Sequence, residues 1–174
     1  MSSALVGVSD RAHVGRWIWA GPMVFLIHDA EEILTVAPWL REHRAELPSV
    51  VQPFSGITTT EFALAVALLF LGFLAAAAHG THRARQGRMS IPFLLVAGVF
   101  AANGITHLGQ AALLRGYTPG VVTALLVVLP YGVLLGVQLR RSGLVTRGSW
   151  VGAVAAGAVL QVPLVVLVLL AVRR

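Results

Sequence analysis

Long apolar runs constrain this chain more than any other feature of its sequence. A helix needs about 20 predominantly apolar residues to cross a ~30 Å hydrocarbon core. Four runs meet that need, over residues 61–79, 91–114, 120–139 and 150–172. Charged residues make up 11% of the chain, whereas soluble domains carry about 25%. The sequence therefore predicts an all-α fold, a polytopic transmembrane helical bundle that forms a single domain over residues 1–174.

A fifth apolar run, over residues 17–37, is interrupted at residues 28–32 by the sequence His-Asp-Ala-Glu-Glu. Each charge near a helix centre costs about 2.5–3.5 kcal/mol on insertion scales, so this run would insert poorly alone. Its apolar flanks and the interfacial pair Trp17 and Trp19 nevertheless fit a span whose polar face is sheltered by a bundle. We therefore predict about five spans.

The basic residues predict an orientation. All of them are arginines, and they gather between the apolar runs, where the positive-inside rule expects them rather than where nucleic acid would bind. Five spans place eight arginines on the N-terminal side and five on the other, which predicts an inside N-terminus and an outside C-terminus. The lysine-free, Ala/Val/Gly-rich composition is typical of a high-GC bacterial genome, so we expect a bacterial inner (cytoplasmic) membrane. The absence of cysteine excludes disulfides and thiolate metal sites.

Two spans carry polar stripes with the same spacing. Side chains at i, i+3, i+4 and i+7 share one face of a helix. The stripe in the first span consists of His28, Glu31, Glu32 and Thr35. The stripe in the third span consists of Asn103, Thr106, His107 and Gln110. In a five-span bundle these two helices run parallel, and at ~1.5 Å per residue both stripes reach the same depth. We therefore expect the stripes to face each other in the bundle interior.

Three further polar groups approach that depth from the outer ends of their helices. Glu61 opens the second span, and Tyr117 and Thr123 lie before and within the start of the fourth. Asp29 lies at the edge of the first stripe. Asn103, Thr106 and Gln110 could serve helix association alone. Two adjacent carboxylates are not needed for that and carry a heavy desolvation penalty, so the cluster predicts a functional site.

The cluster fits metal binding. Imidazole and carboxylate groups from His28, Glu31, Glu32 and His107 could form a catalytic site for a divalent metal such as zinc, and Glu61 would extend the set toward iron or manganese. Three ligands and an open position are the arrangement of catalytic zinc. In this hypothesis the protein is a membrane-embedded enzyme that acts on a lipophilic small molecule.

Two alternatives use the same residues. In the first, Glu31, Glu32, His28, His107 and Asn103 perform metal-free acid/base catalysis, such as isomerisation, cyclisation or epoxide opening. The hydroxyl and amide groups that would orient the substrate are Thr35, Thr106, Gln110, Tyr117 and Thr123. In the second alternative, the His and Glu side chains relay protons in a small transporter. No phosphate-binding loop or nucleic-acid module is present in the sequence.

The combination of residues 28–32, Asn103-x-x-x-His107 and Tyr117-Thr118-Pro119-Gly120-x-x-Thr123 resembles the bacterial HXXEE-motif family of uncharacterised integral membrane proteins. The resemblance covers nearly the whole chain. It implies a membrane protein with His28, Glu31, Glu32, Asn103 and His107 at its site, and it implies no particular reaction. A looser, fold-level similarity links the pattern to five-span sterol-isomerase-like proteins, in which His and Glu transfer protons to lipids.

Overall fold

The computed structural model describes residues 2–47, 49 and 52–173, with side chains from residue 13 onward, and this part of the chain contains no strand. The α-helices are α1 (Ser2–Glu42), α2 (Thr59–Arg85), α3 (Ile91–Leu114), α4 (Val121–Thr123), α5 (Leu129–Arg141) and α6 (Arg147–Val172). Short helical segments η1 (Arg44–Glu46) and η2 (Gln52–Phe54) lie between α1 and α2, and η3 (Ala124–Val128) joins α4 to α5. The prediction of an all-α bundle is confirmed.

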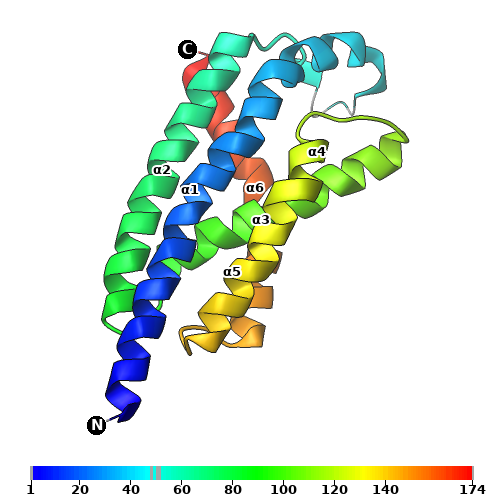
Figure 1. Cartoon of the computed structure of the whole chain (residues 1–174). Coiled ribbons are helices and arrows are strands. Elements are labelled where there is room, and N and C mark those ends of the chain that lie inside the picture. Colours follow the sequence, from blue (N-terminus) through cyan, green and yellow to red (C-terminus); the bar gives the residue numbers. More distant parts are fainter. Residues whose placement is uncertain (1, 48, 50–51, 174) are drawn as a thin grey trace.

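The long helices alternate in direction along the bundle. The N-terminus and the C-terminus lie at opposite ends, and α1 and α3 run in the same sense (Figure 1). Helix α3 crosses the bundle at a steep tilt, between α1 and α6. This arrangement is the one that a five-span chain requires, and it brings the two polar stripes into one layer.

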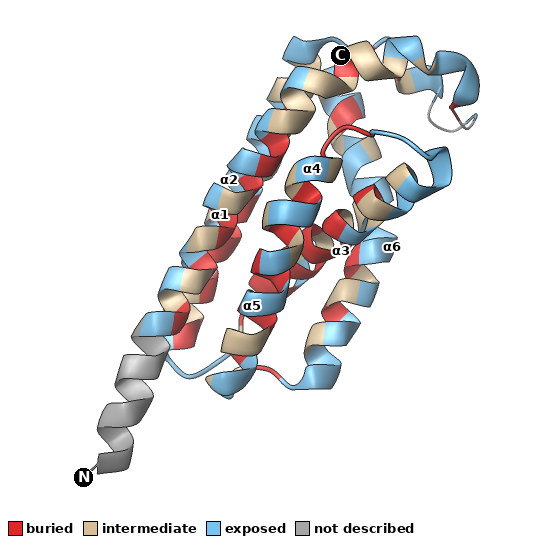
Figure 2. Cartoon of the chain, turned by 45° about the vertical axis from the view of Figure 1, so that its right-hand side comes forward, coloured by how far each residue is buried: buried red, intermediate tan, exposed pale blue. Residues whose placement is uncertain are grey.

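The outer surface is apolar, as a lipid-facing surface must be. Among the described residues, four helices are long and apolar enough to cross a membrane: α2, α3, α6 and the continuous helix Val121–Arg141. Large side chains such as Leu113 (82% exposed) and Leu34 (74% exposed) point outward, and the exposed faces run along every long helix (Figure 2). An apolar surface of this extent identifies a membrane protein.

Helix α1 is not among those four, because its central acidic residues lower its hydropathy. It nevertheless runs the length of the bundle beside α2 (Figure 1). Its inner face is buried at Val14, Ile18 and Phe25, and these three side chains belong to the main apolar core. This packing is consistent with a fifth span, and the count of five stays a prediction.

Helices α3 and α6 touch through their backbones. A Cβ atom added at Gly98 would lie 2.2 Å from the carbonyl oxygen of Ala153, and one added at Gly157 would lie 2.4 Å from the backbone of Gly98. Small residues permit this close approach in membrane helices. The contact fixes the tilt of α3, which carries part of the site.

The helix that follows the loop at residues 115–120 has an unusual segment near its start. Residues Ala124–Val128 form a π-helix, in which the N–H of Leu129 bonds to the carbonyl of Ala124, five residues earlier. Pro130 follows directly, where an α-helix would lose a hydrogen bond. π-Helical segments are rare in proteins, and those that occur often lie at functional sites.

Candidate functional site

Three side chains from two helices converge in the bundle interior. Helix α1 presents His28 and Glu32, which are four residues apart and therefore on one face, and α3 presents His107. One ligand atom from each lies within 4.8 Å of the other two. The Nε2 atom of His107 is 3.2 Å from Oε1 of Glu32, and the His28 side chain is fully buried. The two stripes thus meet, as their equal depth predicts.

The backbone of Gly120 closes this cluster from the loop between α3 and α4. Its φ is +82°. A Cβ at this position would lie 2.8 Å from Cε1 of His107, 2.9 Å from Cε1 of His28 and 3.1 Å from Cγ of Glu32. Both the left-handed conformation and the space available restrict the position to glycine. Sequence reasoning noted the Pro119-Gly120 element and missed this role.

Glu31 has different partners from its neighbour Glu32. Helix α4 begins at Val121, and its N-cap residue, Gly120, has no side chain that could accept the first N–H groups. The Glu31 carboxylate from α1 replaces that cap: it accepts hydrogen bonds from the N–H of Thr123 (2.8 Å) and of Val122 (3.4 Å). A carboxylate at a helix N-terminus also interacts favourably with the helix dipole. Glu31 therefore joins α1 to the start of the fourth span.

Two hydroxyl groups complete the environment of Glu31. The hydroxyl of Tyr117 donates to Oε1 at 2.9 Å, and the hydroxyl of Thr123 donates to Oε2 at 2.6 Å. Burial raises the pKa of Tyr117 above its ordinary value, so the phenol remains a protonated donor at neutral pH. Tyr117 and Thr123 therefore both contact Glu31, and their role in orienting a substrate stays a prediction.

Thr123 also connects Glu31 to His28. Its Oγ1 is 2.9 Å from Nδ1 of His28. Because the Thr123 proton is directed to the carboxylate, the oxygen must accept, and Nδ1 of His28 must donate. This assignment makes Nε2 of His28 an acceptor, and the Asn103 amide donates an N–H to it at 3.4 Å. The chain Glu31–Thr123–His28 thus fixes the tautomer of a candidate ligand.

Two other members of the stripes, Thr35 and Thr106, have local hydrogen-bond partners. The hydroxyl of Thr35 donates to the carbonyl of Glu31 at 2.7 Å, and that of Thr106 donates to the carbonyl of Asn103 at 2.8 Å. Gln110 is exposed near the end of α3. Among the described residues, no hydrogen bond joins the side chain of Thr35, Thr106 or Gln110 to the cluster of three.

Glu61 does not join the cluster either, which corrects the larger ligand set expected from the sequence. It forms a capping box with Thr58: the N–H of Thr58 donates to the Glu61 carboxylate at 2.8 Å, and the N–H of Glu61 donates to the Thr58 hydroxyl at 3.1 Å. The pattern Thr58-x-x-Glu61 before an apolar run is a known signature of a helix start. This local signal could have identified the role of Glu61.

Two polar groups near the site lie outside the predicted set of site residues. The side chain of Gln161, from α6, lies 3.4 Å from the hydroxyl of Thr106. Asp29 is buried, and its Oδ2 has no hydrogen-bond partner among the described residues. A lone glutamine in an apolar run is the only sequence signal for the first. Asp29 lies within the motif, and the sequence predicted it at the edge of the first stripe.

The surroundings are apolar on one side of the cluster and polar on the other. The His28 ring contacts the Phe100 ring edge-on at 6.0 Å, and Phe100 in turn packs against Phe25 and Phe73. Toward the end of the bundle where α1 ends, a cavity of about 320 Å³ is lined by Tyr117 and by residues of α1, η1 and the loop after α3. Tyr117 therefore lies between this cavity and Glu31.

Fold and site together define a class: an integral membrane helical bundle with a buried His/Glu cluster contributed by its first and third long helices. A family model described as a protein of unknown function with HXXEE motif matches residues 19–135. The chain belongs to this family. The matched range contains the motif His28-x-x-Glu31-Glu32, the whole of α2 and α3, and Thr123. Comparison with curated proteins and with solved structures gave no match.

Proposed function

We propose that this protein is a membrane-embedded enzyme that binds one divalent metal ion through His28, Glu32 and His107 and acts on a lipophilic substrate. The observation that carries the proposal is the convergence of the three ligand atoms within 4.8 Å, inside an otherwise apolar bundle. Burying a carboxylate and two imidazoles together is costly unless they are paired or coordinate a metal. Intramembrane ionisable residues of this kind mark functional sites.

One pair of donors has the spacing that a small divalent ion requires. Two ligands at about 2.0–2.1 Å from a tetrahedral centre lie about 3.3 Å apart, and Glu32 and His107 are 3.2 Å apart. The set of two imidazoles and one carboxylate suits zinc, iron or manganese. A metal-binding histidine usually donates its second ring N–H to a nearby acceptor, and His28 does so through Thr123 to Glu31.

Three protein ligands leave a coordination position open, where a bound ion supplies Lewis-acid chemistry. The residues of the chain would prepare that position. The Asn103 amide, 3.4 Å from His28, is close enough to orient a polar group of the substrate. Gly120 excludes side-chain bulk above the cluster, and the phenylalanines near His28 keep its inner side dry. The apolar outer surface implies a substrate that reaches the bundle from the bilayer.

A metal-free proton-transfer enzyme is the second candidate, because the Glu32 carboxyl and the His107 imidazole are in direct contact at 3.2 Å. A proton could pass between them and on to a double bond or an epoxide held nearby. In this case Glu31 and Thr123 would orient His28 as a second base. The same residues would be essential, but no metal would be retained.

Metal analysis of the protein purified in detergent tests the proposal. We expect about one equivalent of a transition metal in the parent and its loss in Glu32→Gln and His107→Gln, since glutamine is a poor ligand for these ions. Glu42→Gln and His82→Gln, which change exposed residues outside the cluster, are matched controls and should retain the metal. A parent that is folded but metal-free after purification and after addition of zinc, iron or manganese would exclude the metal centre and favour proton transfer.

A further inference from the structure

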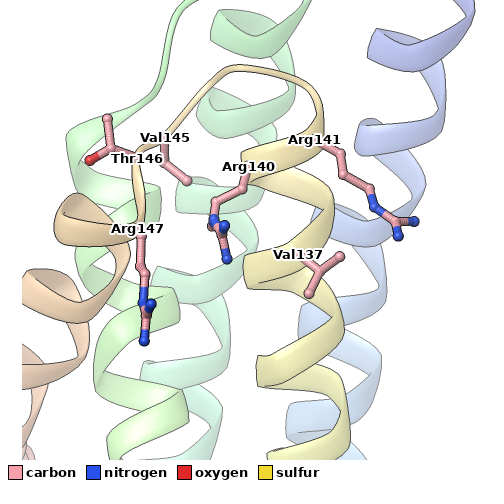
Figure 3. A pocket seen from close by; sticks show the side chains of 6 residues that line it. All are labelled: Val137, Arg140, Arg141, Val145, Thr146 and Arg147. Carbon is pink, nitrogen blue, oxygen red and sulfur yellow. The ribbon is translucent and has the colours of Figure 1, made fainter.

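A second polar site lies at the opposite end of the bundle, where α5 turns into α6. A cavity of about 270 Å³ is lined there by Val137, Arg140, Arg141, Val145, Thr146 and Arg147. Figure 3 shows Arg140 and Arg147 extending in the same direction from the two sides of this turn, with Arg141 directed away from them. Two of the three guanidinium groups can therefore approach one ligand together.

These arginines have no acidic partner among the described residues. The one ion pair found there joins His107 and Glu32, and no hydrogen bond from Arg140, Arg141 or Arg147 is present. The acidic side chains that the structure describes lie in the middle of the bundle or at its other end. Uncompensated guanidinium groups around a cavity favour an anionic ligand with oxygen acceptors, because their planar N–H forks match phosphate geometry.

The cavity continues into an apolar surface. Val133 precedes the lining residue Val137 by one helical turn on α5, and it is 65% exposed. On α6, Val151 follows Arg147 by one turn and is 57% exposed. Side chains four residues apart lie on one face of a helix, so both valines extend the lining toward the membrane interior. A ligand seated here would contact charge at one end and apolar surface at the other.

We propose that this cavity binds the phosphate headgroup of an anionic phospholipid, with Arg140 and Arg147 on the phosphate and the acyl chains along Val133 and Val151. Basic pockets between membrane helices are recognised sites for acidic headgroups. The predicted orientation places this end at the cytoplasmic leaflet, which carries the negative surface potential. A free phosphate would use the arginines alone, so the apolar continuation favours the lipid. The site is separate from the His/Glu cluster and does not depend on a metal.

Native mass spectrometry of the full chain, with lipids of matched acyl chains, tests the proposal. We expect phosphatidylglycerol to bind more tightly than phosphatidylcholine, and Arg140→Gln/Arg147→Gln to weaken phosphatidylglycerol binding by roughly tenfold or more. The matched control is Arg83→Gln/Arg88→Gln, which removes the same charge at the same end of the bundle but outside the cavity. It should change the affinity by less than about twofold. A third variant, Val133→Ser/Val151→Ser, should weaken the lipid while leaving inorganic phosphate unaffected.

Three results would overturn the assignment. Equal weakening by the control pair would show that the general field of the arginines attracts the lipid. Equal binding of phosphatidylcholine would show that the site does not distinguish an anionic headgroup from a zwitterionic one. Inorganic phosphate that displaces the lipid at equal concentration, with no effect of the valine changes, would make this an adventitious anion site. Helix content and thermal melting of each variant in a neutral detergent establish that it is folded before binding is compared.

Discussion

The two adjacent glutamates of the motif should respond in opposite ways to the same substitution. Among the described residues, the polar partner of the Glu32 carboxylate is His107, whereas Glu31 accepts hydrogen bonds from Tyr117 and from the backbone and side chain at the start of the fourth span. We expect Glu32→Gln to abolish metal binding and leave the fold intact. We expect Glu31→Gln to destabilise the fold.

The magnitude follows from the contacts. In Glu31→Gln the amide oxygen can still accept from Thr123, but the NH₂ group replaces the acceptor that serves Tyr117 and Val122. Hydrogen bonds to a charged group stabilise by about 1.5–3 kcal/mol and neutral ones by about 0.5–1.5 kcal/mol, and the interaction with the helix dipole contributes about 0.3–1 kcal/mol. The loss should therefore be about 2–4 kcal/mol. Glu32→Gln replaces a buried carboxylate by a neutral amide and should change stability by less than about 1 kcal/mol.

Thermal melting in detergent, paired with metal analysis, measures both effects. For a chain of this size about 1 kcal/mol corresponds to roughly 2–4 °C, so Glu31→Gln should melt roughly 4–16 °C below the parent. It should retain metal at reduced affinity, because an outer partner of a ligand typically contributes about 10–100-fold. Glu32→Gln should melt within a few degrees of the parent and contain no metal. The reasoning is refuted if Glu31→Gln melts like the parent, or if Glu32→Gln is the less stable of the two.

Two further changes test the site and the topology. Gly120→Ala should lower stability by roughly 2–3 kcal/mol and reduce metal content, because it combines a left-handed backbone with a methyl group 2.8 Å from His107. Thermal melting and metal analysis measure the two effects. The control is Gly72→Ala, whose Cβ would meet nothing within 4 Å and which should be neutral or stabilising. Identical behaviour of the two alanine variants would contradict the role of Gly120. Reporter proteins fused after Arg88 and after Arg147 should both be located in the cytoplasm. Two external locations would contradict the predicted orientation, and one location of each kind would contradict the predicted count of five spans.

The sequence predicted the helices and the core of the site because both depend on periodicity. Apolar length determines which segments cross the membrane, and the spacing of His28 and Glu32 places them on one face of α1 whatever the neighbours are. His107 could be matched to them because parallel spans set a common depth. These inferences use one-dimensional information, and the structure agrees with them.

The roles of Glu31 and Gly120 could not be read in this way. Glu31 caps a helix whose first residue lies 90 positions later in the chain, so no local pattern separates it from Glu32. Gly120 could have been read as a turn residue, but its contact with the ligands depends on the packing of a loop against two helices. The π-helical segment has no sequence signature that we recognise. Glu61 is different, since the capping-box pattern Thr58-x-x-Glu61 is present in the sequence itself and indicates a helix start.

The π-helix η3 sets the rotational phase of the fourth span. Thr123 contacts His28 and Glu31 on α1, and Tyr131, eight residues later, donates its hydroxyl to the carbonyl of Trp17 on the same helix. At about 100° per residue, a regular α-helix would turn Tyr131 about 80° away from the direction of Thr123. Five residues at about 80° each, in the wider turn of a π-helix, bring the two side chains to within about 20°. Deleting one residue of η3 would therefore break the contact of this helix with α1 either at Thr123 or at Tyr131. Every side chain that touches the site would still be present.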